Sequence, residues 1–115
     1  MKSILNQTQQ TLLAENAKIA DSFMTRMVGL LNRKFLSQGE ALIITRCQSI
    51  HMVFMRFSID AVFADKHDSV VGLVKNIKPY QFSSIFFKAS YVIELPVGTI
   101  DRTKTGVGDL LQIQN

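Results

Sequence analysis

The spacing of hydrophobic positions changes along the chain, from a helical period before residue 40 to an extended period after it. Four apolar residues recur at intervals of four, three and one: Phe23, Met27, Leu30 and Leu31. These intervals place the four side chains on one helix face, and Asp21 or Ser22 supplies the N-cap. The pattern predicts one main helix over residues 22–33.

Short extended runs occupy most of the chain after this helix. The runs rich in β-branched and aromatic residues span residues 41–45, 49–57, 59–64, 69–77, 91–95 and 110–113. The polar turn at 65–68 separates two β-branched runs, and this arrangement predicts a hairpin. Pro96 ends one run, and residues 98–104 are expected to form a short helix or turn.

The N-terminal residues mix polar and apolar positions without a clear period. Residues 11–13 and 17–20 are predicted to be short strands, with Glu15 and Asn16 as the turn between them. Residues 1–8 are expected to be a flexible or edge-strand N-terminus.

Together these elements predict an α+β, mostly antiparallel β fold, built as a small barrel or sandwich with one helix closing an end. The chain has 115 residues, of which 47% are hydrophobic. A chain of this length supports one hydrophobic core, so we expect residues 1–115 to form a single domain.

Charge and cysteine content narrow the classes of function. Thirteen basic and nine acidic residues give a net charge of +4, but only Arg33 and Lys34 are adjacent basic residues. This dispersion argues against a specific nucleic-acid partner, because such proteins concentrate charge on one stripe or helix. One cysteine, Cys47, excludes an internal disulfide and fits a reducing compartment.

Neither an export signal nor a membrane span is visible in the sequence. The first residues turn polar after Ile4 and Leu5, whereas a signal peptide needs an apolar stretch of about 7–15 residues. No apolar run approaches the roughly 18 residues of a transmembrane helix. We therefore expect a cytoplasmic protein.

Recognised catalytic and metal-binding patterns are missing from the sequence, including Gly-rich phosphate loops and His-Glu-x-x-His. Cys47 and His51 are four residues apart, which on a strand separates them by about 13 Å. Neither a Cys–His nucleophile nor a metal site is expected from that spacing, and no cofactor is expected. His51 is either a polar residue lining a cleft or a hydrogen-bonded structural residue.

Two carboxylates, Asp60 and Glu94, lie among the apolar residues of predicted strands. A buried carboxylate must be paired or hydrogen-bonded. The two either form an acid–base pair or ligand site, with Arg26 or Arg56 as a basic partner, or serve only as structural groups.

One apolar segment falls between predicted strands. Residues 82–88 contain Phe82, Ile85, Phe86 and Phe87. Exposed apolar side chains in such a loop mark an interface or a lid over a cleft.

Four ordered segments carry a resemblance to a known family. They are 26–31 (Arg-Met-Val-Gly-Leu-Leu), 49–63, 91–98 and the pair at 108–109. In this order they resemble the bacterial and archaeal family called domain of unknown function 192, over roughly residues 17–113. Leu31 stands where the family usually has Met, and Ser58 where it commonly has Pro.

The resemblance implies a compact, mainly β domain with no established activity, in a family of which many members carry export signals. Three functions remain open. The first is a binding module whose polar cleft takes a small molecule or peptide; its candidate lining residues are Arg26, His51, Arg56, Asp60 and Glu94. The second is a hydrolase-type enzyme that uses Asp60 and Glu94 as general acid and base. The third is a protein–protein interaction module that uses the loop at residues 80–88.

Overall fold

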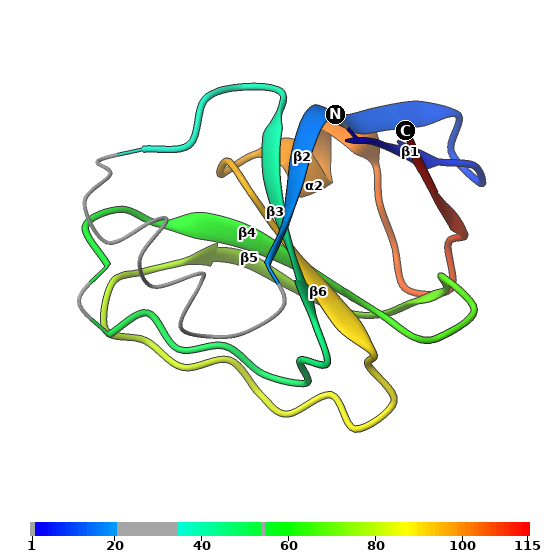
Figure 1. Ribbon diagram of the computed structural model, residues 1–115. Helices are drawn as coiled ribbons and strands as arrows, with labels where there is room; N and C mark the ends of the chain where they lie inside the picture. The colour runs from blue at the N-terminus through cyan, green and yellow to red at the C-terminus, as the bar shows by residue number, and fades with distance from the viewer. Residues whose placement is uncertain (1, 21–34, 54) are drawn as a thin grey trace.

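Seven strands form one curled sheet in the computed structural model, which describes residues 2–20, 35–53 and 55–115 (Figure 1). The strands are β1 (Lys2–Asn6), β2 (Thr11–Ala20), β3 (Glu40–Thr45), β4 (Ile59–Ala64), β5 (Val70–Ile77), β6 (Tyr91–Leu95) and β7 (Leu111–Gln114). A short helix, α2 (Thr99–Thr103), follows β6.

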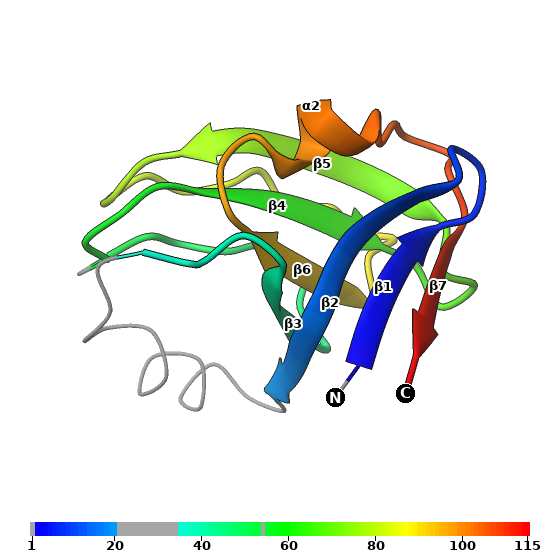
Figure 2. The ribbon, with the colours of Figure 1, turned by 90° about the horizontal axis from the view of Figure 1, so that it is seen from above.

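The strand order is β5-β4-β6-β3-β2-β1-β7, and every neighbouring pair is antiparallel except β2 and β3. The sheet curls until its two edge strands approach each other at one end, as Figure 2 shows from above. There the N–H of Val70 donates to the carbonyl of Asp109 over 2.9 Å, and Leu111 donates to Asp68 over 2.9 Å. The result is a half-barrel.

The two faces of the sheet carry separate hydrophobic clusters. The inner core lies on the concave face and includes Leu13, Val62, Ile93 and Ile100, the last from α2. The outer core lies on the other face, and its larger buried members are Ile44, Ile50, Met52, Met55, Ile59, Phe63 and Val92. Because side chains alternate along a strand, neighbouring residues of one strand contribute to different cores.

The sequence predictions of a mostly antiparallel fold and of the hairpin at 65–68 are confirmed. The run at 59–64 is β4 and the run at 91–95 is β6, while the short helix at 98–104 is α2. The predicted main helix at 22–33 lies outside the described residues.

Two predictions near the N-terminus are wrong. Residues 11–20 form one strand, and the pairing of β1 with β2 shifts register between Ala14 and Ala17. Glu15 and Asn16 are thus a β-bulge, and their N–H groups both donate to the carbonyl of Gly39. β1 pairs with both β2 and β7, so the strand within residues 1–8 is an inner strand and not an edge.

The extended run predicted at 49–57 is not a strand of the sheet. Its apolar residues Ile50, Met52 and Met55 are buried on the outer core. Its backbone bonds instead to the loop that precedes β6, as in the 2.8 Å bond from Met52 N–H to the Gln81 carbonyl. Tertiary packing took the place of strand pairing here.

Candidate functional site

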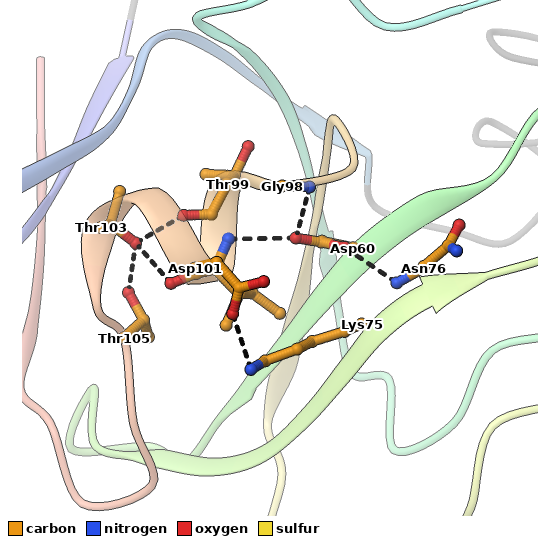
Figure 3. A network of polar contacts seen from close by, with 9 residues as sticks. Asp60, Lys75, Asn76, Gly98, Thr99, Asp101, Thr103 and Thr105 are labelled. Atoms are coloured by element: carbon orange, nitrogen blue, oxygen red, sulfur yellow. Dashed lines mark hydrogen bonds and ion pairs between the residues drawn. The ribbon is translucent and has the colours of Figure 1, made fainter.

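Asp60 is a buried carboxylate whose oxygens are occupied by backbone donors (Figure 3). It is 1% exposed. Its Oδ1 accepts a hydrogen bond from Asn76 N–H at 2.9 Å, and its Oδ2 accepts from Gly98 N–H at 3.1 Å and Ile100 N–H at 3.0 Å. The carboxylate therefore joins β4 to β5 and to the start of α2.

This arrangement makes Asp60 the N-terminal cap of α2. Gly98 precedes the helix at φ 95° and has no side chain to cap it. Asp60 supplies the missing acceptor from a distant strand, so two of the helix's unpaired N–H groups are satisfied. Nearby, the Asp101 carboxylate lies 2.7 Å from Lys75 Nζ on the surface, and this contact raises the pKa of Lys75.

Glu94 is fully buried on the opposite face of the sheet. Its neighbours Ile93 and Leu95 belong to the inner core, so strand alternation turns Glu94 to the outer face. Its cross-strand partner Ala61 also belongs to the outer core. Since Asp60 points to the inner side, the sheet separates the two carboxylates and they share no cleft.

The other three sequence-predicted residues are placed differently. His51 is half-buried, and its Nδ1 accepts a hydrogen bond from Val53 N–H at 3.3 Å. Its ring lies 6.1 Å from that of Phe82, centroid to centroid. Arg56 is exposed, and Arg26 lies outside the described residues. The structure thus brings His51 to the loop before β6 and leaves Asp60 on the other side of the sheet.

That loop, residues 80–88, is called the aromatic loop from here on. It lies against residues 46–53, the facing segment, and Figure 1 shows the two running together along the lower edge of the molecule. Backbone hydrogen bonds of 2.9 Å and 2.8 Å join Ser83 to Ile50 and Phe86 to Gln48. The Gln48 side chain donates to the Phe87 carbonyl at 2.7 Å. The loop is therefore held in one conformation by bonds along its length.

One phenylalanine anchors the aromatic loop to the outer core. The ring of Phe86 packs 4.5 Å from that of Phe63, centroid to centroid. It fills the space where Gly72 has no side chain, because a Cβ at Gly72 would lie 2.3 Å from the Phe86 ring. Sequence reasoning missed this anchor, although a glycine inside the β-branched strand β5 is a signal of close approach.

The remaining large apolar residues of the aromatic loop face solvent. Phe82 is 72% exposed, Ile85 is 55% exposed and Phe87 is 78% exposed. These three meet the condition that the sequence analysis set for an interface or lid, whereas Phe86 is half-buried against the outer core.

A second buried polar network lies at the closed end of the half-barrel. Asn6 Nδ2 donates to Asp109 Oδ2 at 3.0 Å and to Thr105 Oγ1 at 3.2 Å, and Gly106 N–H donates to Asp109 Oδ2 at 2.9 Å. Burial raises the pKa of Asp109, but these hydrogen bonds outweigh it and hold the pKa below its usual value.

The lowered pKa of Asp109 predicts a loss of stability in acid. A carboxyl with a lower pKa in the folded state stabilises the fold above its unfolded pKa of 3.8, and this contribution disappears as the pH falls through the folded value. We expect Asp109→Asn to be about 1 kcal/mol less stable than the native chain at pH 7, with the gap closing below about pH 4. Urea denaturation at a series of pH values measures it; a constant gap would contradict the prediction.

Two grooves open on the surface at the β1–β2 hairpin, away from the sequence-predicted residues. One, of about 220 Å³, is lined by Thr11, Leu12, Leu13, Ala14, Glu15, Gln38, Gly39 and Arg102. The other, of about 330 Å³, is lined by Leu5, Asn6, Gln7, Gln10, Thr11, Leu12 and Gln112. Within the described part of the chain, no three His, Cys, Asp or Glu residues are grouped to hold a metal, and no helix has the length and apolar character to cross a membrane.

Comparison with known families and proteins returns uncharacterised relatives. The model of the family DUF192, described as "Uncharacterized ACR", matches residues 4–113. A UPF0127 protein of Thermococcus sibiricus is 37% identical over 110 residues, covering 92% of this chain and 71% of the relative. A UPF0127 protein of Pyrococcus furiosus is 33% identical over 115 residues, covering 95% of this chain and 96% of the relative.

Solved structures with the same fold come from two bacteria. A protein of unknown function from Novosphingobium aromaticivorans superimposes with a TM-score of 0.80 at 18% identity, covering 96% of this chain and 82% of that one. A candidate transcription regulator from Sinorhizobium meliloti superimposes with a TM-score of 0.77 at 19% identity, covering 96% and 90%. Both are similar to this chain in fold alone.

Proposed function

The chain belongs to the DUF192 family, which is described as uncharacterised, and we propose that it is a binding module that docks through the aromatic loop. The observation that carries the proposal is the exposure of Phe82 and Phe87, at 72% and 78%. Large apolar side chains grouped on one loop of a folded domain mark a surface that another molecule covers.

The contacts that fix the loop backbone support a docking function for its exposed side chains. Phe86 ties the middle of the loop to the outer core, and Ser83 and Gln48 bond it to the facing segment. A loop already fixed in one conformation loses little further entropy on binding. The exposed side chains are therefore presented on a prepared scaffold.

The polar-cleft and hydrolase functions considered from the sequence are less well supported. Asp60 is buried and accepts three backbone hydrogen bonds, which suits a structural role. A general acid and a general base must both reach one reacting group, and the sheet lies between Asp60 and Glu94. His51 lies beside the aromatic loop, with its ring 6.1 Å from that of Phe82, centroid to centroid.

Binding of an apolar dye tests the proposal. Anilinonaphthalene sulfonate fluoresces on exposed apolar protein surface, so the native chain should enhance its fluorescence. The double variant Phe82→Ser/Phe87→Ser should lose most of this signal, because two large apolar groups leave the surface. Leu12→Ser/Val107→Ser is the matched control, since Leu12 and Val107 are exposed apolar residues outside the loop.

Circular dichroism establishes that each variant is folded under the conditions of the dye titration. Equal dye signals from the two double variants, or none from the native chain, would rule out docking through the aromatic loop.

A further inference from the structure

Resting on the docking function proposed above, we propose that the target of the aromatic loop is the surface of an anionic lipid bilayer, into which Phe82, Ile85 and Phe87 insert. Three properties of this surface favour a bilayer: its apolar tips, the positive charges beside them, and the hydrogen bonds of the loop backbone.

The chain segments that build this surface carry charge of one sign. The facing segment 46–53 and residues 78–90 together contain three basic residues and no acidic one. The basic residues, all exposed, are Arg46, Lys78 and Lys88. All nine acidic residues of the chain lie outside these segments, so the segments carry only positive charge, whereas the whole chain carries both signs. Basic groups beside apolar tips are attracted to anionic headgroups.

The apolar tips have the chemistry of interfacial anchors. Phe82 and Phe87 are aromatic, and their exposures of 72% and 78% mean that they project from the surface. Lys78 and Lys88 lie just outside them in the sequence, where their long stems can lie along acyl chains while the ammonium groups stay at the headgroups. Phe86 holds the centre of the loop on the outer core, which limits insertion to the tips.

Part of the backbone of the aromatic loop is hydrogen-bonded on the protein side. Ser83 N–H donates to Ile50, and Phe86 N–H donates to Gln48. The carbonyl of Phe87 accepts from Gln48 Nε2, and that of Ser84 accepts from Ser83 Oγ at 2.9 Å. Polar backbone groups that lack partners are costly in an apolar phase, so these bonds make shallow insertion of the loop feasible.

A lipid surface fits these features better than an acidic protein does. An interface between proteins needs a complementary concave surface to enclose projecting aromatic anchors. A fluid bilayer closes around three projecting side chains without any matched shape. Phe82, Ile85 and Phe87 project from this surface as tips suited to insertion.

Sedimentation with vesicles tests the inference. The full chain is mixed with vesicles of phosphatidylcholine alone, or of phosphatidylcholine with about 30% phosphatidylglycerol, and the bound fraction is measured. We expect binding to the anionic vesicles, weaker binding to the neutral ones, and a loss of affinity when salt rises from about 0.1 M to about 1 M.

Variants separate the apolar and charged contributions. Phe82→Ser/Phe87→Ser should weaken partition into anionic vesicles by about tenfold or more, while Leu12→Ser/Val107→Ser leaves it unchanged. Lys78→Gln/Lys88→Gln should weaken it, and Lys18→Gln/Lys66→Gln, which removes the same charge from exposed positions elsewhere, should weaken it much less.

The outcomes distinguish this inference from the proposed function. Failure to bind anionic vesicles, or equal binding by the loop variants and their controls, overturns the lipid target. If the dye titration still depends on Phe82 and Phe87 in that case, docking stands and the target is of another kind. Binding to soluble polyglutamate that requires the loop, without vesicle binding, would assign the surface to an acidic protein and reject the lipid.

Discussion

Replacing Asp60 with alanine should lower the free energy of unfolding by about 3–5 kcal/mol. The substitution leaves the N–H groups of Asn76, Gly98 and Ile100 without their acceptor in a buried site. Each orphaned buried donor costs on the order of 1–3 kcal/mol, and the three costs overlap because they share one carboxylate. Such a loss is a large part of the roughly 5–15 kcal/mol that stabilises a domain. Urea denaturation followed by circular dichroism gives the value.

Asp60→Asn keeps the shape of the side chain and is measured if the alanine variant does not fold. Its amide retains one acceptor oxygen, so we expect a smaller loss of about 2 kcal/mol. Asp101→Asn is the control: the Asp101 side chain is 72% exposed and pairs with Lys75 at the surface. An exposed ion pair contributes about 0–1 kcal/mol, so this variant should stay close to the native chain. Equal losses from Asp60→Ala and Asp101→Asn would refute the capping role.

Replacing Gly72 with alanine should cost about 2 kcal/mol and loosen the aromatic loop. The added Cβ would lie 2.3 Å from the Phe86 ring, which is held against Phe63. The ring must leave its site, and the exposed tips of the loop then lose their anchor. Thermal unfolding measures the loss of stability. The dye titration measures the loosening of the aromatic loop as a changed fluorescence intensity.

A double-mutant cycle assigns this cost to the ring. In a chain that carries Phe86→Ala, the methyl of Gly72→Ala meets no ring, so the second substitution should cost much less than it does alone. Gly106→Ala is the matched control, because a Cβ there has only one neighbour, Asp109 Oδ2 at 3.9 Å. Additive costs for Gly72 and Phe86 would show that the close approach does not constrain the strand.

The local pattern of the sequence predicted those strands whose partners are close along the chain. Residues 59–64 and 69–77 are two β-branched runs around a polar turn, and a hairpin follows directly from that order. The run from Tyr91 to Leu95 was bounded by Pro96, which removes a backbone donor and ends the strand. Alternation alone did not predict residues 49–57 correctly, because Ile50, Met52 and Met55 pack on the outer core without strand pairing.

The candidate site is likewise divided between features that are visible in the local sequence and features that only the tertiary structure sets. The sequence alone marked Asp60 and Glu94 as unusual, because each is a charged residue among apolar neighbours. It also marked the aromatic loop, because that segment is rich in phenylalanine. Which face each carboxylate occupies depends on register and strand order, and these are set by pairing between distant segments. The link between Asp60 and α2 spans 40 residues, so no local pattern contains it.

By itself, the sequence determined which local elements this protein contains: mostly antiparallel strands, a polar minority within them, a short helix or turn near the C-terminus and a phenylalanine-rich loop. Local propensity and turn chemistry suffice for these features, because they depend on residues that are close in the chain. The tertiary structure alone decided that the sheet curls into a half-barrel, that Asp60 caps a helix, and that Phe86 packs half-buried on the outer core while Phe82 and Phe87 are exposed. These outcomes depend on which distant surfaces meet, and the fit of one ring over Gly72 is enough to choose among three similar phenylalanines.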